Sequence, residues 1–237
     1  MLRLVDLSLD IYDHAPTFGP DPKTAVLPHM GVANMGYNIT QLILSTHLGT
    51  HLDAPFHFFD DGRTVENLDV RRGFGPAWVL DFSHKGPKAE ITPDDLAPHA
   101  AKITPGSRLI FRTDWDKQFP QPHYFSDQPY LGPAGCAWLV ERQVATVALD
   151  MPTIYPADYI TVHHILLRPE VLVIEGLTGL ERLRGEEVIL CALPLRIRGR
   201  DGSPCRAMAI DADSAAELSS LVELFAALDF AARPAAH

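Results

Sequence analysis

Val171-Leu172-Val173-Ile174-Glu175 is the stretch of sequence that most clearly indicates the fold. Its apolar residues lead into a carboxylate without a break, which is typical of a strand buried on both faces. Similar runs bounded by Gly, Pro or Asp occur at Ala77–Phe82, Leu109–Thr113 and Ala145–Asp150. Helical patterns occupy Pro133–Arg142 and Asp158–Arg168. Buried strands that alternate with helices predict an α/β protein whose sheet is covered on both faces.

Acidic residues stand at or just past the ends of these strand-like runs, namely Asp81, Asp114, Asp150 and Glu175. Ligand sites of α/β sheets form beyond the carboxyl ends of the strands. A buried carboxylate is costly unless it is paired or bound to a metal. A helix cap or a surface position is the simpler interpretation of such an acid. Glu175 is the exception, because unbroken apolar sequence leads directly into it.

Length and composition limit the classes of protein to which the chain can belong. The 237 residues fit one domain spanning 1–237, and 46% hydrophobic with 21% charged residues exclude intrinsic disorder. The net charge of −10, without a basic run, argues against nucleic acid or an anionic membrane as partner. No apolar stretch approaches the roughly 20 residues of a membrane span, and no signal peptide is recognisable. We therefore expect a soluble, cytoplasmic protein.

The C-terminal part of the sequence predicts two further elements. Val188–Arg198 and Arg206–Asp211 fit a β-hairpin with Asp201-Gly202 as its turn. The segment Asp213–Ala232 has helical periodicity and few helix breakers. We expect this helix to pack on the body of the protein or on a second subunit.

The chemical signal is concentrated in a histidine-rich segment. Its polar residues are all odd-numbered, whereas the apolar residues between them are even-numbered: His47, His51, Asp53 and His57 against Leu48, Leu52, Phe56 and Phe58. An extended chain would place the polar set on one face. A straight strand would hold His47 and His51 about 13 Å apart, too far to share an ion. Gly49 allows the chain to fold back and Pro55 prevents a regular helix, so the pattern predicts a metal-binding turn.

A second set of candidate ligands lies later in the chain. His163 and His164 fall on the helix expected before Pro169, and Glu175 ends the next strand. Spacing alone does not decide which of these residues approaches the first histidine cluster. Imidazoles combined with one or two carboxylates suit Zn²⁺ and leave a coordination position for water.

The run His47-Leu-Gly-Thr-His51-Leu-Asp53-Ala-Pro55-Phe-His57-Phe58 resembles the His-X-Gly-Thr-His-X-Asp-X-Pro-X-His-Phe signature of the putative cyclase family. That family contains the bacterial kynurenine formamidases and the isatin hydrolases. The resemblance continues through most of the chain, at Val5–Ser8, His163–His164, Ile174–Leu177, Ala192–Leu195 and Asp201–Ala207. It implies a single-domain α/β fold of the swivelling β/α/β type with a mixed sheet. It also implies a homodimer or a larger assembly such as a homotetramer.

The resemblance further implies a metal centre that hydrolyses a C–N amide bond. His47, His51 and Asp53 would bind a first zinc ion, and Asp53 would bridge to a second one held by His163, with Glu175 contacting the metals. His57 would be the general acid/base. Isatin hydrolases are similar but use manganese, so Mn²⁺ and a single ion are alternatives to two Zn²⁺.

The resemblance also bears on the substrate. Formamidases of the family carry a Trp-Pro-Gly-Asp stretch, and here Thr17-Phe18-Gly19-Pro20-Asp21 takes its place. Phe18 would replace the tryptophan, and Phe18 and Phe58 are candidate substrate contacts. The expected substrate is a small, aromatic amide, with N-formylkynurenine as the first candidate.

Two alternatives from other classes remain open. One is a metal-dependent cyclase or lyase that acts through an enolate. Detection of a released amine or acid would distinguish a hydrolase from this alternative. The other is a non-catalytic zinc-binding protein. Structural zinc sites are usually closed and rich in cysteine. The additional His57 beside a sufficient ligand set therefore favours an enzyme.

Overall fold

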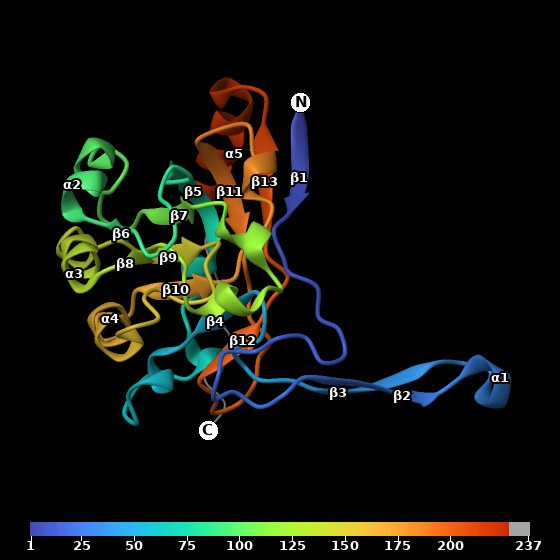
Figure 1. Cartoon of the computed structure of the whole chain (residues 1–237). Coiled ribbons are helices and arrows are strands. Elements are labelled where there is room, and N and C mark those ends of the chain that lie inside the picture. Colours follow the sequence, from blue (N-terminus) through green and yellow to red (C-terminus); the bar gives the residue numbers. More distant parts are fainter. Residues whose placement is uncertain (228–237) are drawn as a thin grey trace.

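A nine-stranded mixed sheet forms the centre of the computed structural model, which describes residues 1–227 (Figure 1). Its strand order is β1-β13-β11-β5-β7-β9-β10-β4-β12. The strands are β1 (Leu2–Asp6), β4 (His51–Asp53), β5 (Phe74–Asp81), β7 (Arg108–Arg112), β9 (Thr146–Leu149), β10 (Leu172–Glu175), β11 (Glu187–Cys191), β12 (Gly202–Pro204) and β13 (Met208–Ala212). The middle strands β5, β7, β9 and β10 are parallel, and the outer strands pair antiparallel.

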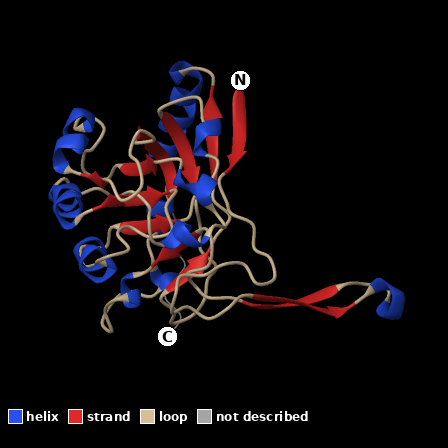
Figure 2. Ribbon diagram, in the orientation of Figure 1, coloured by secondary structure: helices blue, strands red, loops and turns tan. Residues whose placement is uncertain are grey.

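Helices cover one face of the parallel strands (Figure 2). They are α2 (Pro93–Leu96), α3 (Pro133–Glu141) and α4 (Tyr159–Leu167), and a small second sheet of β6 (Glu90–Ile91) and β8 (Tyr130–Leu131) lies near them. Leu109 and Phe111 face the helix side, whereas Ile110 between them packs into a second apolar cluster on the opposite face. The predicted α/β class, the four predicted strands and the two predicted helices are therefore confirmed.

The predicted late hairpin is only partly correct. β11 and β13 do pair antiparallel, but Asp201-Gly202 is not the turn between them. Gly202–Pro204 instead form β12, which pairs with β4 at the far edge of the sheet. A Cβ on Gly202 would lie 2.7 Å from the carbonyl oxygen of Leu52, so glycine permits this close strand pairing.

The C-terminal helix α5 (Ala215–Ala227) lies within the predicted segment, and residues 228–232 of that segment fall outside the described residues. Leu218 is buried against Ile189 of β11. The Phe225 ring meets that of Phe74 edge to face, with 4.7 Å between the centroids. α5 therefore packs on the body of its own chain. In the part of the chain described, no helix is both long and apolar enough to cross a membrane.

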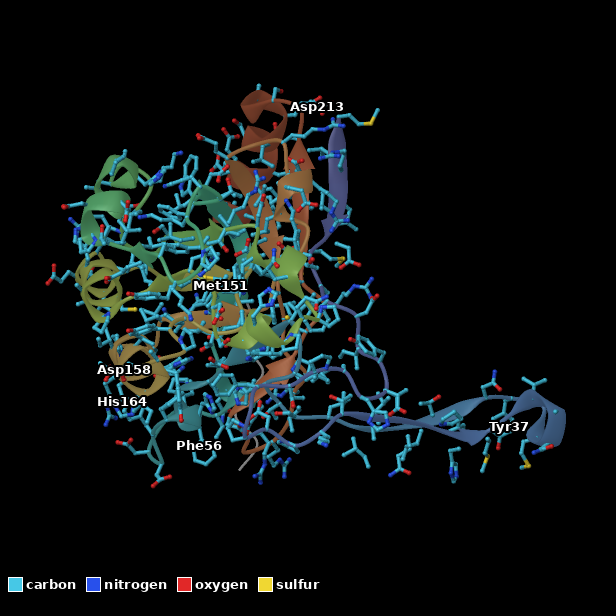
Figure 3. The ribbon with its side chains drawn as sticks, in the orientation of Figure 1. Tyr37, Phe56, Met151, Asp158, His164 and Asp213 are labelled. Atoms are coloured by element: carbon cyan, nitrogen blue, oxygen red, sulfur yellow. The ribbon has the colours of Figure 1, made fainter. Side chains whose placement is uncertain are left out.

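A two-stranded arm extends away from the body (Figures 1 and 3). It consists of β2 (Ala25–Met30), α1 (Val32–Met35) and β3 (Ile39–Ile43), and we call residues 25–43 the arm. Seven large apolar side chains of the arm are exposed: Leu27, Val32, Met35, Tyr37, Ile39, Leu42 and Ile43. An isolated hairpin of this kind is marginally stable in water. The arm thus presents a bare apolar surface far from the core.

The antiparallel register of β4 and β10 brings two of the predicted ligands together. His51 lies directly opposite Glu175, and Asp53 lies opposite Val173. The chain then turns at Gly176, which has φ +67°. The Gly176 carbonyl oxygen accepts a 2.5 Å hydrogen bond from the Thr50 hydroxyl. The end of β10 is therefore tied to the turn that enters β4.

Replacing Gly176 by alanine should destabilise this junction. The new Cβ would collide with the carbonyl oxygen of Gly49, and the positive φ is unfavourable for alanine. We expect a loss of more than about 1 kcal/mol in the free energy of unfolding, measured by chemical denaturation. Gly86→Ala is the control, because nothing lies within 4 Å of a Cβ there. Equal stability of the two variants would contradict the argument.

Candidate metal centre

The first residues of the candidate metal centre lie on the turn that precedes β4. Gly49 has φ +59°, a left-handed conformation that glycine adopts readily, and the chain reverses there as predicted. His51 and Asp53 follow at alternate positions of β4 and so face the same side, while Leu52 packs into the core on the other. The reversal places Nδ1 of His47 2.8 Å from Oδ1 of Asp53.

His163 approaches the same carboxylates from α4. The helix is capped by the Asp158 side chain, which accepts a 3.2 Å hydrogen bond from the Thr161 backbone. Nδ1 of His163 lies 2.6 Å from the backbone carbonyl of Tyr159. Its Nε2 therefore faces inward, where it lies 3.3 Å from an oxygen of Asp53 and 3.3 Å from one of Glu175.

His51 is oriented in the same way. Its Nδ1 lies 2.9 Å from the carbonyl oxygen of Gly49, and its Nε2 lies 3.5 Å from Asp53 and 3.5 Å from Glu175. In both His51 and His163, one ring nitrogen is held by a backbone carbonyl and the other points at the acids. Metal-binding histidines commonly show this arrangement, because the outer hydrogen bond fixes the ring and its tautomer.

The carboxylates of the cluster strongly shift the pKa values of the neighbouring histidines. Burial alone lowers the pKa of His47, but hydrogen bonds to Asp201 and Asp53 outweigh it and raise the pKa to about 10. For His163, burial is likewise outweighed by Asp53 and Glu175, and the pKa rises to about 10. Burial would raise the pKa of Asp53, but its histidine partners hold it well below its usual range. The acids of this cluster thus stabilise positive charge on the residues beside them.

His57 differs from the other histidines. It ends the short helix η1 (Pro55–His57), and its ring stacks on that of His47 with 3.8 Å between centroids. Neither ring nitrogen hydrogen-bonds to a described residue, and Nδ1 lies 3.9 Å from Asp201. Burial, assisted by the neighbouring histidine cations, lowers the pKa of His57 to about 4. His57 is therefore neutral at pH 7, and burial makes its ring harder to protonate than a free imidazole.

Two buried oxygens fit a metal ion. Oδ2 of Asp53 and Oε1 of Glu175 have no hydrogen-bond partner, although the residues are only 1% and 4% exposed. Each of these oxygens lies 3.3 Å from Nε2 of His163, an ion-pair distance without a hydrogen bond. His51, Asp53 and Glu175 offer donor atoms within 4.8 Å of one another, and His47, Asp53 and His57 do the same. This donor set, with two buried oxygens that accept no hydrogen bond, fits a divalent metal.

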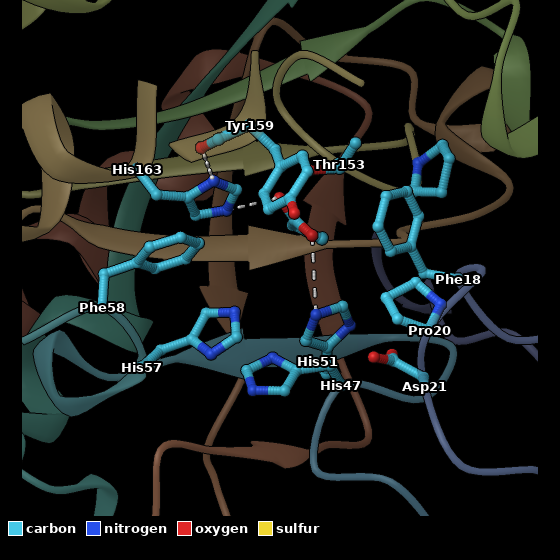
Figure 4. A pocket seen from close by; sticks show the side chains of 12 residues that line it. Phe18, Pro20, Asp21, His47, His51, His57, Phe58, Thr153, Tyr159 and His163 are labelled. Atoms are coloured by element: carbon cyan, nitrogen blue, oxygen red, sulfur yellow. Dashed lines mark hydrogen bonds and ion pairs between the residues drawn. The ribbon is translucent and has the colours of Figure 1, made fainter. Parts of the chain in front are cut away.

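An open cleft of about 200 Å³ lies above the cluster (Figure 4). Phe58 forms one wall and stacks on His163, with ring centroids 4.7 Å apart. Phe18 forms the opposite wall and meets Tyr159 edge to face at 5.7 Å. This cleft is smaller than typical ligand pockets, which measure roughly 300–1,000 Å³, so it fits only a small molecule. Its two aromatic walls fit an aromatic ring.

The structure brings the eight predicted site residues to this one place. The set comprises His47, His51, Asp53, His57, His163 and Glu175, with Phe18 and Phe58 in the walls. His164 is exposed and lies beside Phe59. Spacing alone does not distinguish His163 from His164, and the orientation of α4 separates them.

Of the four acids at strand ends, Glu175 alone lies in the cluster. Asp150 is fully buried, but it accepts hydrogen bonds from the hydroxyl and backbone of Thr113 and from the backbone of Asp114. Asp114 pairs with Arg112, and Asp81 is exposed. These three acids therefore support loops.

Sequence reasoning missed two carboxylates of the site. Oδ2 of Asp201 lies 2.7 Å from Nε2 of His47 and accepts a 2.8 Å hydrogen bond from the Thr46 hydroxyl. Asp21 lines the cleft next to Phe18. The Asp-Gly pair at 201–202 was interpreted as a turn, since a local pattern does not reveal a partner 154 residues away.

Comparisons with known proteins agree with this geometry. A family model described as "Putative cyclase" matches residues 5–155. The chain is 32% identical to a kynurenine formamidase of Geobacillus thermodenitrificans over 207 residues, which cover 86% of this chain and 95% of that protein. It is also 32% identical to a kynurenine formamidase of Bordetella avium over 217 residues, covering 88% and 98%.

A solved structure is also similar. The crystal structure of an isatin hydrolase bound to the product analogue thioisatinate matches with a TM-score of 0.81 and 25% identity, covering 88% of this chain and 92% of that one. The family model spans more than half of the chain and includes the complete histidine-rich segment. The chain belongs to the putative cyclase family.

Proposed function

We propose that the protein is a metal-dependent hydrolase that cleaves the C–N amide bond of a small aromatic substrate, with N-formylkynurenine as the first candidate. The buried His/Asp/Glu cluster carries the proposal, because it lies at the floor of an aromatic-walled cleft and two of its carboxylate oxygens accept no hydrogen bond. Similarity to proteins named kynurenine formamidase and isatin hydrolase supports the amide substrate.

The reaction converts an aryl formamide and water into an aryl amine and formate. Water supplies the oxygen that bonds to the formyl carbon, and the bond from that carbon to nitrogen breaks. One proton must reach the leaving nitrogen, because an amide anion is a poor leaving group. A second proton is released as the formic acid ionises. The site must therefore activate water and move a proton.

For the metal ligands we propose the set that the resemblance to the cyclase family implies. His47, His51 and Asp53 would hold one ion, and Asp53 would share a second ion with His163 and Glu175. A divalent ion supplies Lewis-acid polarisation of an amide carbonyl and activates water at neutral pH. The imidazole and carboxylate donors suit Zn²⁺, and Mn²⁺ is the alternative.

His57 is proposed as the general acid/base. Its neutral ring can take a proton from water and deliver it to the leaving nitrogen. The stacked His47 ring fixes the position of the imidazole. Phe18 and Phe58, on opposite sides of the cleft, would hold the aromatic ring of the substrate.

We further infer that the chain assembles as a homodimer or a homotetramer. The arm supports this proposal, because it exposes apolar side chains on a hairpin that its own body does not cover. An apolar groove lies where the arm joins the body, and Leu42, Leu193 and Leu195 line it. The arm and groove of a second copy offer matching apolar surfaces. A cytoplasmic location stays a prediction from the sequence.

The first test is hydrolysis of N-formylkynurenine by purified protein. We expect kynurenine and formate to be released, the activity to disappear with a chelator, and Zn²⁺ or Mn²⁺ to restore it. Asp53→Asn should lose bound metal, measured by elemental analysis, while exposed His164→Asn should retain it. Full activity of chelated, metal-free protein would contradict the proposal.

His57→Asn should separate proton transfer from metal binding. We expect unchanged metal content and a decrease in kcat of about 10²- to 10⁴-fold, the usual contribution of a general acid/base. Stopped assays of formate release and elemental analysis of the same sample provide both values. Loss of metal in this variant would make His57 a ligand, and unchanged kcat would remove it from the reaction.

Leu42→Glu should weaken the assembly by placing a charge on the apolar arm. The matched control is Leu224→Glu on α5, since the two leucines are 56% and 55% exposed. Light scattering after size exclusion should show a smaller particle for the arm variant alone. Dissociation caused by the α5 variant alone would instead place the interface on that helix.

A further inference from the structure

Tyr159 places an aromatic ring inside the cleft. It is the first residue of α4 and stands four positions before His163, so the two side chains lie on one face of the helix. The backbone carbonyl oxygen of Tyr159 lies 2.6 Å from Nδ1 of His163, which ties the start of the helix to this candidate ligand. The tyrosine ring is therefore held next to the candidate metal centre.

The ring of Tyr159 lies between the two aromatic walls of the cleft (Figure 4). Its centroid is 5.7 Å from that of Phe18, at an interplanar angle of 73°. The centroid of Phe58 lies 6.5 Å away on the other side, at an angle of 59°. Aromatic rings in direct contact have centroids roughly 4.5–7 Å apart. No further ring fits between Tyr159 and either wall, so a substrate ring must use the space that Tyr159 leaves free.

Both walls are braced from behind, so they do not move apart freely. Phe18 meets Phe125 edge to face with 6.5 Å between the centroids, and Phe125 meets the buried Tyr124 in the same way at 5.0 Å. Phe58 stacks on His163 at 4.7 Å. Well-packed side chains resist extra volume, and forcing a larger group between them is unfavourable. The width available to a substrate is therefore set by the walls and the tyrosine ring between them.

The free space matches a single aromatic ring. The cleft holds about 200 Å³, and a protein cavity of about 150 Å³ is enough for one benzene molecule. Once one ring has entered, a second fused ring has little room unless Tyr159 moves. The Tyr159 hydroxyl makes no hydrogen bond with any described residue, so the limit comes from the volume of the ring.

We propose that Tyr159 is a specificity-determining residue that restricts the substrate to the amide of a single, unfused aromatic ring. The inference rests on the proposed amide hydrolysis and narrows its substrate class by ring size. N-formylkynurenine has one aromatic ring and stays within that class. Because the selection is steric, it does not depend on the charges of the histidines or of the metal.

Two hydroxamates that differ only in the ring test this limit by binding. Benzohydroxamate and 2-naphthohydroxamate share a head group that chelates divalent ions. We expect Zn²⁺-loaded protein to bind benzohydroxamate at least about tenfold more tightly in isothermal titration calorimetry, because overpacking outweighs the larger apolar area of the naphthyl ring. Without a steric limit the naphthyl probe would bind more tightly, so equal or tighter binding of that probe overturns the inference.

Tyr159→Ala assigns the limit to this ring. The variant keeps the backbone carbonyl that contacts His163, so we expect unchanged metal content by elemental analysis. The ratio of the two dissociation constants should shift at least about tenfold in favour of the naphthyl probe, because the overpacking is relieved. Tyr159→Phe, which keeps the ring, should retain the wild-type ratio. A ratio that Tyr159→Ala does not alter would contradict the proposal.

Ile160→Ala is the matched control on the same helix. Ile160 is the next residue of α4, is 49% exposed against 37% for Tyr159, and is not among the described residues that line the cleft. This variant should leave the ratio of the dissociation constants unchanged. An equal shift in Ile160→Ala and Tyr159→Ala would assign the effect to the helix rather than to the ring and so overturn the inference.

Formanilide and N-(2-naphthyl)formamide separate this inference from the proposed function. Hydrolysis of both amides with equal kcat/KM would overturn the size limit and leave the proposed function standing. If neither of them nor N-formylkynurenine is hydrolysed with any metal, the proposed function fails. The ratio of the hydroxamate dissociation constants would then still decide whether Tyr159 limits the size of a ligand.

Discussion

The register between β4 and β10 is the constraint on which the site depends. Only this register places His51 directly opposite Glu175, because a slip by one residue would turn every side chain of β4 to the other face. The Thr50–Gly176 hydrogen bond and the close approach of Gly49 and Gly176 lock it from one end. β12 pairs along the other side of β4 and brings Asp201 to the histidines. The chemistry of the site is thus set by backbone pairing.

The site concentrates charge that the fold alone does not neutralise. Asp53 and Glu175 are almost completely buried, and each retains an oxygen without a hydrogen bond. A protein optimised for stability alone would replace such groups by apolar residues. Here the surrounding core is apolar on both faces of the sheet, so the free-energy cost of buried charge is confined to the candidate metal centre. Such local conflict between stability and charge is typical of functional sites.

Local patterns predicted part of this arrangement. Alternation along His51–Asp53 and the glycine turn after His47 are properties of a short segment, and the sequence was sufficient to place these ligands together. The choice between His163 and His164 was different, since it depends on how α4 lies against the sheet. Asp201 could not be found because an Asp-Gly pair is a strong turn signal, and a local pattern does not show that Gly202 pairs with Asp53 across the sheet. Metal identity stayed open because zinc and manganese accept the same donors.

The proposed ligands come from segments far apart in the chain, with Asp53 and Glu175 separated by more than a hundred residues and β10 paired with both β9 and β4. Their convergence requires loop closures that become possible only when the central strands have already assembled. The ligands are together only in the folded chain, so an ion that binds them stabilises the folded state over the unfolded one. Metal supply would therefore govern how much of the protein is folded as well as how much is active.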